Sequence, residues 1–315
     1  MSIKETKTKY KNNEINKIDF VNKMHDFHKV LFDFSENLRG TEIFRIEILD
    51  GQLIYTTRET DYHPGGCSFF VDVLDKRITP IDTFNFDLYE QSDSKLLFDL
   101  IKDGDIIFDI GANIGWYSCH FARKLPKSVI YSFEPIPETF RKLQMNVELN
   151  NFSNLVLNNL ALSSKIEKTT FFYSPTVTGA SSAKNITENE DMQRIECITD
   201  TVDNFSETFK IDRLDFIKCD VEGAEIHVFQ GGLETLNKCK PIIFTEMLRK
   251  WTAKFGYTPN DIIQLLKEIG YQCFICENDY FKVIENVTED TIQTNFFFLN
   301  TEKHKSIINQ YSLNV

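Results

Sequence analysis

Four acidic residues in this chain of 315 residues each end a short apolar run that has the composition of a β-strand. The four are Asp109, Glu134, Asp220 and Glu246. In a parallel sheet, ligands bind beyond the carboxyl ends of the strands. Carboxylates at that edge can accept hydrogen bonds, take a proton from a substrate or coordinate a cation. We therefore expect these four side chains to face one crevice.

The segment FDIGANIGW, residues 108–116, reads as a strand, a glycine-containing turn and a helix. Gly111 has no Cβ, so the backbone can turn there and approach a ligand closely. Free N–H groups at the start of the following helix can bind an anionic group such as a carboxylate. We expect this segment to bind a cofactor through Asp109, Gly111, Ala112, Asn113 and Gly115.

The second acidic residue, Glu134, lies 25 residues after Asp109 and can accept two hydrogen bonds from a ribose diol. Nicotinamide and S-adenosylmethionine sites share this feature, so the glycine spacing must distinguish them. A dinucleotide turn has the pattern G-x-G-x-x-G. Here the glycines are Gly111 and Gly115, and Asn113 replaces the middle one. This pattern favours a cofactor with an amino-acid tail, S-adenosyl-L-methionine, over NAD.

From about Ser92 onward, strand-like and helix-like segments alternate. Such alternation predicts an α/β fold with a mostly parallel sheet covered on both faces. One predicted helix spans residues 222–236, after the strand that ends at Asp220. Glu225 is then expected only to decorate the N-terminus of this helix, where the dipole favours a negative charge. His227 is expected to leave the crevice face and to point into solvent.

Four ordered segments resemble the FkbM family of methyltransferases. They are FDIGANIGWYS, YSFEPIPETFRKLQMNVELN, IDRLDFIKCDVEGAEIHVFQGG and PIIFTE. The resemblance runs from about Leu97 to Leu299, roughly two thirds of the chain. It implies a Rossmann-like methyltransferase fold, with a mostly parallel seven-stranded sheet that contains an antiparallel strand. It also implies S-adenosyl-L-methionine as the methyl donor and O-methylation, often of sugar or polyketide hydroxyls.

The resemblance adds three residues to the predicted cofactor site. Asn159 and Ala161 end the third strand, where adenine usually sits in this fold, and Ser182 lies in a polar loop similar to a family loop near the cofactor. Amino-group methylases commonly carry an acidic residue or Asn, two prolines and an aromatic residue at the fourth strand. The sequence there is CDVEG, residues 219–223, which favours an oxygen acceptor.

A sugar hydroxyl is a weak acid, so a general base, or a cation that lowers its pKa, would assist methyl transfer. The candidates are Asp220, Glu246, Glu222 and, in a His-Pro-Gly-Gly loop that could lie over the site, His63. Asp220 could instead contact the amino group of the cofactor. The paired carboxylates could also hold a divalent cation, although no metal site is expected.

The composition argues against several classes of partner. The net charge is −12, whereas a protein that binds nucleic acid normally presents a basic face. The sequence contains no run of about 18 apolar residues, so no membrane span is expected. The first residues lack the apolar core of a secretory signal, and the seven cysteines are odd in number and irregularly spaced. We therefore expect reduced thiols and a cytoplasmic protein.

The first 90 residues lie outside the resemblance. We expect two parts in this chain: an N-terminal extension, residues 1–90, and a catalytic methyltransferase domain, residues 91–315. In the extension, the apolar residues Phe20, Met24, Phe27, Leu31, Phe34 and Leu38 follow the spacing of one helical face. This helix is expected either to dock on its own domain or to pair with its copy in a homodimer. Two strand-like runs flank Asp50-Gly51, a hairpin signal. The extension could thus serve as a substrate cap or a dimerisation element.

The leading functional hypothesis is an O-methyltransferase whose acceptor is a small glycosyl compound, such as a nucleotide sugar or a precursor of a capsule or another surface polysaccharide. A polyketide-type acceptor is an alternative. An NAD-dependent oxidoreductase keeps Glu134 as the ribose ligand but lacks the middle glycine. The remaining alternative is a binding module that has lost catalysis, which the four intact carboxylates disfavour.

Overall fold

The computed structural model describes residues 1–61, 63–86, 91–176, 179, 181–185 and 192–312. Its centre is an eight-stranded sheet in the order β13-β12-β14-β11-β10-β4-β5-β6. The strands are β4 (Ile106–Ile110), β5 (Val129–Phe133), β6 (Leu155–Asn158), β10 (Phe216–Cys219), β11 (Ile242–Glu246), β12 (Tyr271–Glu277), β13 (Tyr280–Val283) and β14 (Asn295–Asn300). The five strands from β11 to β6 are parallel, and β14 runs antiparallel between β11 and β12.

The predicted Rossmann-like fold is confirmed, and the sheet has one strand more than the seven expected. The additional strand is β13, which pairs antiparallel with β12. Asn278 and Asp279 close the hairpin between them with φ angles of 53° and 65°. Two consecutive left-handed residues form the tight turn that matches the twist of paired strands, and Asn and Asp tolerate this conformation.

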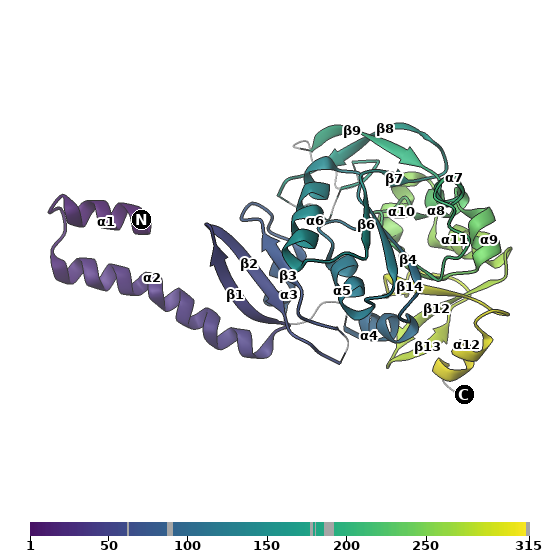
Figure 1. The fold of residues 1–315 in the computed structure, drawn as a ribbon, viewed down its shortest axis with the longest axis horizontal. Helices are drawn as coiled ribbons and strands as arrows, with labels where there is room; N and C mark the ends of the chain where they lie inside the picture. The colour runs from purple at the N-terminus through teal and green to yellow at the C-terminus, as the bar shows by residue number, and fades with distance from the viewer. Residues whose placement is uncertain (62, 87–90, 177–178, 180, 186–191, 313–315) are drawn as a thin grey trace.

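Helices cover both faces of the sheet (Figure 1). They are α4 (Gln91–Leu100), α5 (Trp116–Lys124), α6 (Pro137–Asn150), α7 (Val202–Thr208), α8 (Glu225–Gln230), α9 (Leu233–Cys239), α10 (Arg249–Phe255), α11 (Pro259–Lys267) and α12 (Lys305–Tyr311). Neighbouring strand residues point to opposite faces, so Ile107 packs into one apolar cluster and Phe108 into the other. Each face of the sheet therefore has its own core.

The helix expected over residues 222–236 is wrong as one element, because the chain forms α8 and α9 instead. Gly231 and Gly232 separate the two helices, and a Cβ on Gly231 would lie 2.0 Å from the carbonyl oxygen of Ser163. The close approach of another backbone therefore interrupts the helix. A second small sheet, β7-β9-β8, lies beside the main sheet and comprises β7 (Ala161–Leu162), β8 (Glu167–Tyr173) and β9 (Gln193–Asp200).

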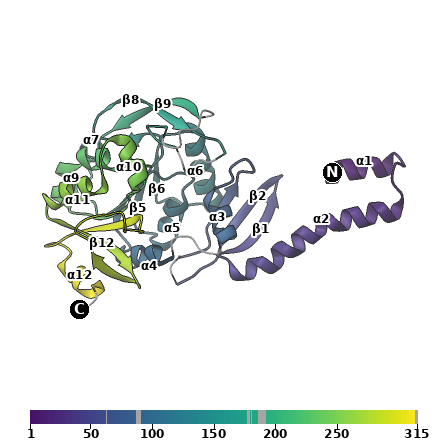
Figure 2. The same ribbon diagram turned by 180° about the vertical axis from the view of Figure 1, so that it is seen from behind.

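The N-terminal segment begins with a helical hairpin of α1 (Ile3–Lys11) and α2 (Lys17–Asn37), which projects away from the rest of the molecule (Figures 1 and 2). A 3-10 turn, η1 (Leu38–Gly40), leads into an antiparallel sheet of β1 (Ile43–Leu49), β2 (Gln52–Thr57) and β3 (Ser68–Val71), and α3 (Thr79–Phe86) follows. The hairpin predicted at Asp50-Gly51 is confirmed. The expectation that the first long helix docks on its own domain is wrong for most of its length, since α2 has no buried residue.

The β1–β3 sheet, in contrast, packs against α6. Asn150 accepts a hydrogen bond from the backbone N–H of Ser68, and Asn146 accepts one from that of Phe70. Phe69 belongs to the same apolar cluster as Phe121 of α5. No helix in the described parts of the chain is both long and apolar enough to cross a membrane.

Candidate active site

A cavity of about 460 Å³ lies beyond the carboxyl ends of β4, β5, β10 and β11. Seven of the predicted site residues line it: Gly111, Asn113, Glu134, Ala161, Asp220, Glu222 and Glu246. Six others do not: Asp109, Ala112, Gly115, Asn159, Ser182 and His63. The structure therefore brings together the residues at the edge of the sheet and places several of the others behind the wall of the cavity.

The turn after β4 requires its glycines. Gly111 has a φ of +77°, and a Cβ there would lie 1.8 Å from the carbonyl oxygen of Asp220. Gly115 has a φ of +89°, and a Cβ there would lie 2.5 Å from Cδ1 of Leu143. Asn113 also adopts a left-handed conformation, with a φ of 50°, which Asn tolerates better than most residues. The backbone therefore forms a tight cradle at the cavity wall.

Glu134 lies directly opposite this cradle. Its carboxylate accepts hydrogen bonds from the backbone N–H groups of Asn113 (3.0 Å) and Ile136 (2.9 Å). Burial nevertheless raises the pKa of Glu134 to about 7. The side-chain amide of Asn159 donates to the carbonyl oxygens of Glu134 and Pro135, so Asn159 fixes this loop from behind. Each Glu134 oxygen can accept a further hydrogen bond from a ligand in the cavity.

Beyond Glu134 four apolar residues line the cavity, Phe133, Ile136, Leu162 and Phe171, together with the hydroxyl residues Ser163, Thr169 and Thr199. Phe171 comes from β8 of the small sheet, a strand that was not among the predicted elements. The alternating pattern of the segment EKTTFFY, residues 167–173, is the signal that could have revealed this strand. A flat apolar ring system fits such a slot, whereas a charged group would lose its hydration there.

The buried residue Lys218 of β10 links the cradle to the acidic end of the cavity. Its Nζ donates to the carbonyl oxygen of Gly111 (3.1 Å) and lies 3.7 Å from Oδ1 of Asp109 and 3.6 Å from Oδ2 of Asp220. Asp109 is fully buried and accepts a hydrogen bond from Ser118. Burial raises the pKa of the Asp109 carboxyl, and Lys218 opposes that shift. Lys218 was not among the predicted site residues, although a lysine inside the apolar strand FIKC is itself a signal.

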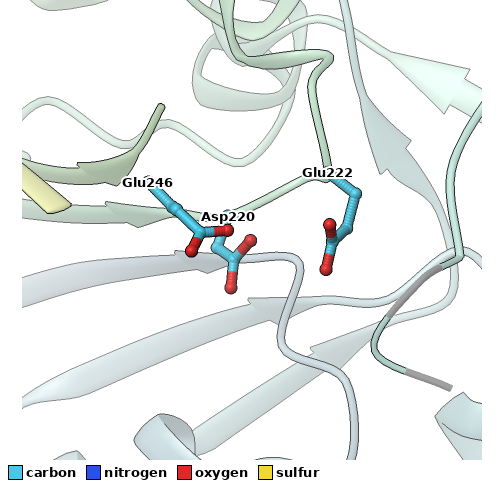
Figure 3. A group of neighbouring side chains, drawn as sticks. All are labelled: Asp220, Glu222 and Glu246. Atoms are coloured by element: carbon cyan, nitrogen blue, oxygen red, sulfur yellow. The ribbon is translucent and has the colours of Figure 1, made fainter. Parts of the chain in front are cut away.

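Asp220, Glu222 and Glu246 converge at the other end of the cavity (Figure 3), and one oxygen of each lies within 4.8 Å of the others. Oδ1 of Asp220 is buried and forms no hydrogen bond in the described part of the chain. Burial raises the pKa of Glu222 well above its usual value, and repulsion from Asp220 and Glu246 adds to the shift. Within the cluster, both causes favour the protonated form of the Glu222 carboxyl. Such a group can donate a hydrogen bond while its charged neighbours accept hydrogen bonds or a proton.

A strained turn holds Glu222 in this position. Its φ is +54°, and the Ser182 hydroxyl donates to its carbonyl oxygen at 2.9 Å. Ser182 therefore supports the acidic cluster and does not line the cavity. Glu225 is buried, and its carboxylate accepts hydrogen bonds from the N–H groups of Val221 and Gly223 and from the hydroxyl of Tyr257. Glu225 thus stabilises the turn, a larger role than decoration of a helix end.

The expectation that His63 lies over the crevice is wrong. Its side chain is 3% exposed, and its ring packs against Phe98, Trp116 and His120. The loop folds inward at Gly65, where a Cβ would lie 2.1 Å from the backbone of Glu59. Burial also lowers the pKa of His63 well below its usual value.

The expectation that His227 leaves the crevice is also wrong, because His227 lines the cavity. The helix begins at Glu225 and not at Glu222, and this later start rotates the following side chains about the helix axis. Leu248, which immediately precedes α10, and Trp251 and Phe255 of α10 complete this wall. Arg77, Thr79 and Asp82 contribute from the N-terminal segment, and Arg77 forms an ion pair with Asp82 at 2.8 Å.

This sheet, with its glycine cradle, its carboxylate after the second parallel strand and its acidic cluster after the fourth and fifth, defines a Rossmann-like methyltransferase. The profile of the methyltransferase FkbM domain matches residues 109–273, more than half of the chain, and the chain belongs to this family. Family membership places the chain among methyltransferases and not among the oxidoreductases that share a similar turn.

Two relatives illustrate the similarity. The chain is 30% identical over 146 residues to "Methyltransferase 1" of Beauveria bassiana, which covers 41% of this chain and 59% of that protein. It is 27% identical over 179 residues to the hexuronic acid methyltransferase AglP of Haloferax volcanii, which covers 57% of this chain and 68% of that protein. The chain thus spans less than two thirds of the first relative.

Among solved structures, the methyltransferase FkbM from Methylobacillus flagellatus KT resembles the chain with a TM-score of 0.39 and 15% identity. This similarity covers 72% of this chain and 55% of that chain.

Proposed function

We propose that the chain is an S-adenosyl-L-methionine-dependent O-methyltransferase that acts on a hydroxyl group of a sugar or a sugar-containing metabolite, such as a nucleotide sugar or a surface glycan precursor. The observation that carries this proposal is the convergence of Asp220, Glu222 and Glu246 at one end of the cavity that the Gly111 cradle borders. A weakly acidic hydroxyl needs such a group to remove its proton.

The donor set of the cavity fits S-adenosyl-L-methionine. Glu134 would accept hydrogen bonds from the ribose, because both of its oxygens are already oriented by backbone N–H groups. The apolar slot of Ile136, Leu162 and Phe171 suits an adenine ring. The amino-acid tail would lie against the cradle, because Gly111 and Asn113 line the cavity. When bound, this cofactor supplies an electrophilic methyl group.

The residues at the acidic end would then act on the acceptor. Asp220, paired with Lys218, would accept the proton that the hydroxyl loses as its oxygen attacks the methyl group. Glu222, whose pKa burial raises, would donate a hydrogen bond to a neighbouring hydroxyl. Glu246 would accept one from the same acceptor. The cluster would thus orient two adjacent hydroxyls, which is a common feature of sugars.

Two further observations support a sugar acceptor. Trp251 and Phe255 line the same part of the cavity, and flat aromatic faces are suitable platforms for the apolar side of a sugar ring. One relative, at 27% identity, is named a hexuronic acid methyltransferase. The net charge of −12 supports a small-molecule acceptor over a nucleic acid.

The test of the acceptor is methyl transfer from labelled S-adenosylmethionine to a panel of nucleotide sugars, glycan precursors, polyketides, peptides and nucleosides. We expect label in a glycosyl hydroxyl and none when Asp220 is replaced in D220N. The matched control is D212N, because Asp212 has an 88% exposed side chain. Transfer to a peptide or a base and to no glycosyl acceptor would overturn the proposal.

The test of the cofactor is calorimetry with S-adenosylhomocysteine and, separately, with NAD. We expect binding of S-adenosylhomocysteine, and E134A is expected to weaken it. Binding of NAD alone would contradict the assignment, and binding of neither would favour a module that has lost catalysis.

We also propose that methylation takes place in the cytoplasm, before the glycan is exported. All seven cysteines are buried and free of disulfides, as is typical of proteins in a reducing compartment. Cell fractionation tests this. Recovery of the native enzyme from an oxidising compartment would contradict it.

A further inference from the structure

One face of α2 is exposed and yet has the composition of a helix–helix contact. Ile18, Val21, His25, His28 and Phe32 follow one another at spacings of three and four residues. This spacing is the seam pattern of a coiled coil. Ile18, Val21 and Phe32 are 74%, 52% and 56% exposed. We call these five residues the α2 stripe.

A different face of α2, which carries Phe20 and Phe34, packs against other parts of the same chain at its two ends. Phe20 stacks on Tyr10 of α1 with a centroid distance of 4.3 Å, and Phe34 stacks on Phe84 of α3 at 4.9 Å. The α2 stripe lies about a third of a turn away from that face. Neither α1 nor the body of the protein covers it.

Exposed apolar side chains gather in this part of the chain. Of the 22 large hydrophobic residues that are exposed in the described ranges, 14 lie within residues 1–86. Three of these 14 residues belong to the α2 stripe, and exposed apolar side chains that lie together on one face mark an interaction site.

The charges of the N-terminal segment indicate the occupant. Residues 1–17, at the free end of the helical hairpin, carry five lysines and two glutamates. Residues 41–61, where α2 meets the body, carry five acidic residues and two arginines, and four of the acidic residues, all except the buried Glu42, are at least partly exposed. The free end is therefore basic and the base is acidic. Two copies paired antiparallel would place the basic end of each beside the acidic base of the other, whereas a parallel pair would bring like charges together.

A lipid surface fits this segment less well. The 21 residues of α2 hold three lysines and four acidic residues, so the helix that carries the stripe is not basic. An interfacial helix on anionic lipids needs a basic polar face.

We propose that the α2 stripe is the seam of an antiparallel homodimer in which α2 pairs with α2 of a second copy. With a two-fold axis between residues 26 and 27, Val21 of one copy faces Phe32 of the other, and His25 faces His28. The stripe is thus complementary to itself, as a two-fold interface requires. The helix spans roughly 31 Å at 1.5 Å per residue, long enough for both ends to reach the charged regions of the partner. This inference goes beyond the proposed function and does not depend on it.

The first test is the mass of the full-length protein in solution by analytical ultracentrifugation. We expect twice the chain mass of 36.7 kDa. F32D should raise the dissociation constant by about thirtyfold or more, since buried interface aromatics commonly contribute that much. I292D is the matched control, because Ile292 is 85% exposed but far along the chain from α2. It should leave the dimer unchanged.

Circular dichroism distinguishes loss of the dimer from loss of folding. The F32D variant should retain the helical signal of the native protein. The charge reversal K7E with K11E, which leaves the α2 stripe unchanged, should also raise the dissociation constant of the dimer. A native protein that is monomeric, a dimer that survives F32D, or a monomer that binds vesicles of phosphatidylserine would each overturn the proposal.

The second test is the orientation of the pair. The native cysteines are all buried, so a cysteine added at the surface is the accessible thiol. A mixture of V21C and F32C, one of them tagged, should form a mixed disulfide on mild oxidation, and neither variant alone should crosslink. Crosslinking of each variant with itself, and none in the mixture, would indicate a parallel pair and overturn the antiparallel assignment.

Discussion

The catalytic part of the chain buries its apolar residues, whereas the N-terminal helical hairpin leaves many of its apolar residues exposed. Around the main sheet, each strand sends alternate side chains into one of two intramolecular cores, as Ile107 and Phe108 do. In α2 no residue is buried, although the helix has 21 residues and an apolar stripe. The comparison teaches that sequence periodicity identifies an apolar face of a helix or strand, but it does not say whether the chain itself buries that face.

The two regions also differ in how they use charge. In the cavity, acidic residues are concentrated and partly or fully buried, and this burial raises the pKa values of Glu134 and Glu222. In the N-terminal segment most charges are exposed, with lysines at the free end of the helical hairpin and acidic residues where α2 meets the body. The first arrangement changes protonation states, whereas the second can only steer and orient a partner.

The largest expected effect is on catalysis. Asp220→Asn should lower turnover by about 10²–10⁴-fold, the usual contribution of a general base. The affinity for S-adenosylhomocysteine should change little, because Asp220 is assigned to the acceptor. Steady-state kinetics and calorimetry measure the two quantities. If D220N loses cofactor affinity as severely as a Glu134 variant, Asp220 contacts the cofactor instead, and Glu246 becomes the candidate base.

The next effect contrasts stability in the two regions directly. Phe298 of β14 is 1% exposed, whereas Phe32 of α2 is 56% exposed. Phe298→Ala should lower the free energy of unfolding by about 3–5 kcal/mol. Phe32→Ala should change it by less than about 0.5 kcal/mol in dilute solution. Urea unfolding of both variants measures this, and equal losses would contradict the contrast.

A smaller effect is expected at the ribose end of the cavity. Glu134→Ala removes hydrogen bonds to a ligand, which should cost about 1.5–3 kcal/mol of binding free energy. The dissociation constant of S-adenosylhomocysteine should therefore rise about tenfold to a hundredfold. Calorimetry measures it, with Glu138→Ala as a control because Glu138 lies on α6 outside the cavity wall. An unchanged constant would remove Glu134 from the cofactor site.

The smallest effect concerns the pH dependence of stability. Burial raises the pKa of Glu225 from 4.5 to about 7. Between these values the folded protein keeps a proton that the unfolded chain has lost, so this group lowers stability as pH rises. Glu225→Gln keeps the oxygen that accepts from Val221 and Gly223 but cannot lose a proton. Its Tm should fall less than that of the native protein between about pH 5 and pH 8, by a few degrees. If the Tm values of the two proteins change equally with pH over this range, the Glu225 side chain is ionised throughout and the prediction is wrong.

Much of the catalytic domain follows from local patterns. Strands and helices alternate with their own periods, and the turn at Gly111 needs a residue without a Cβ. The ends of parallel strands share one edge of a sheet, so the positions of Asp220 and Glu246 after two such strands are enough to predict that they lie together. These features depend on backbone conformations that neighbouring residues encode.

The sequence by itself therefore determined the fold class, the family and the edge of the sheet that carries the chemistry. Only the tertiary structure decided which side chains line the cavity, which support it from behind and which turn away from it. Lys218 joins Asp109 to Asp220 across neighbouring strands, and His63 turns into the core because its loop folds at Gly65. His227 enters the cavity because α8 starts three residues later than its pattern suggests. The physical reason is common to all three: the direction of a side chain depends on the exact start of its element and on packing with distant segments, which a local pattern does not contain.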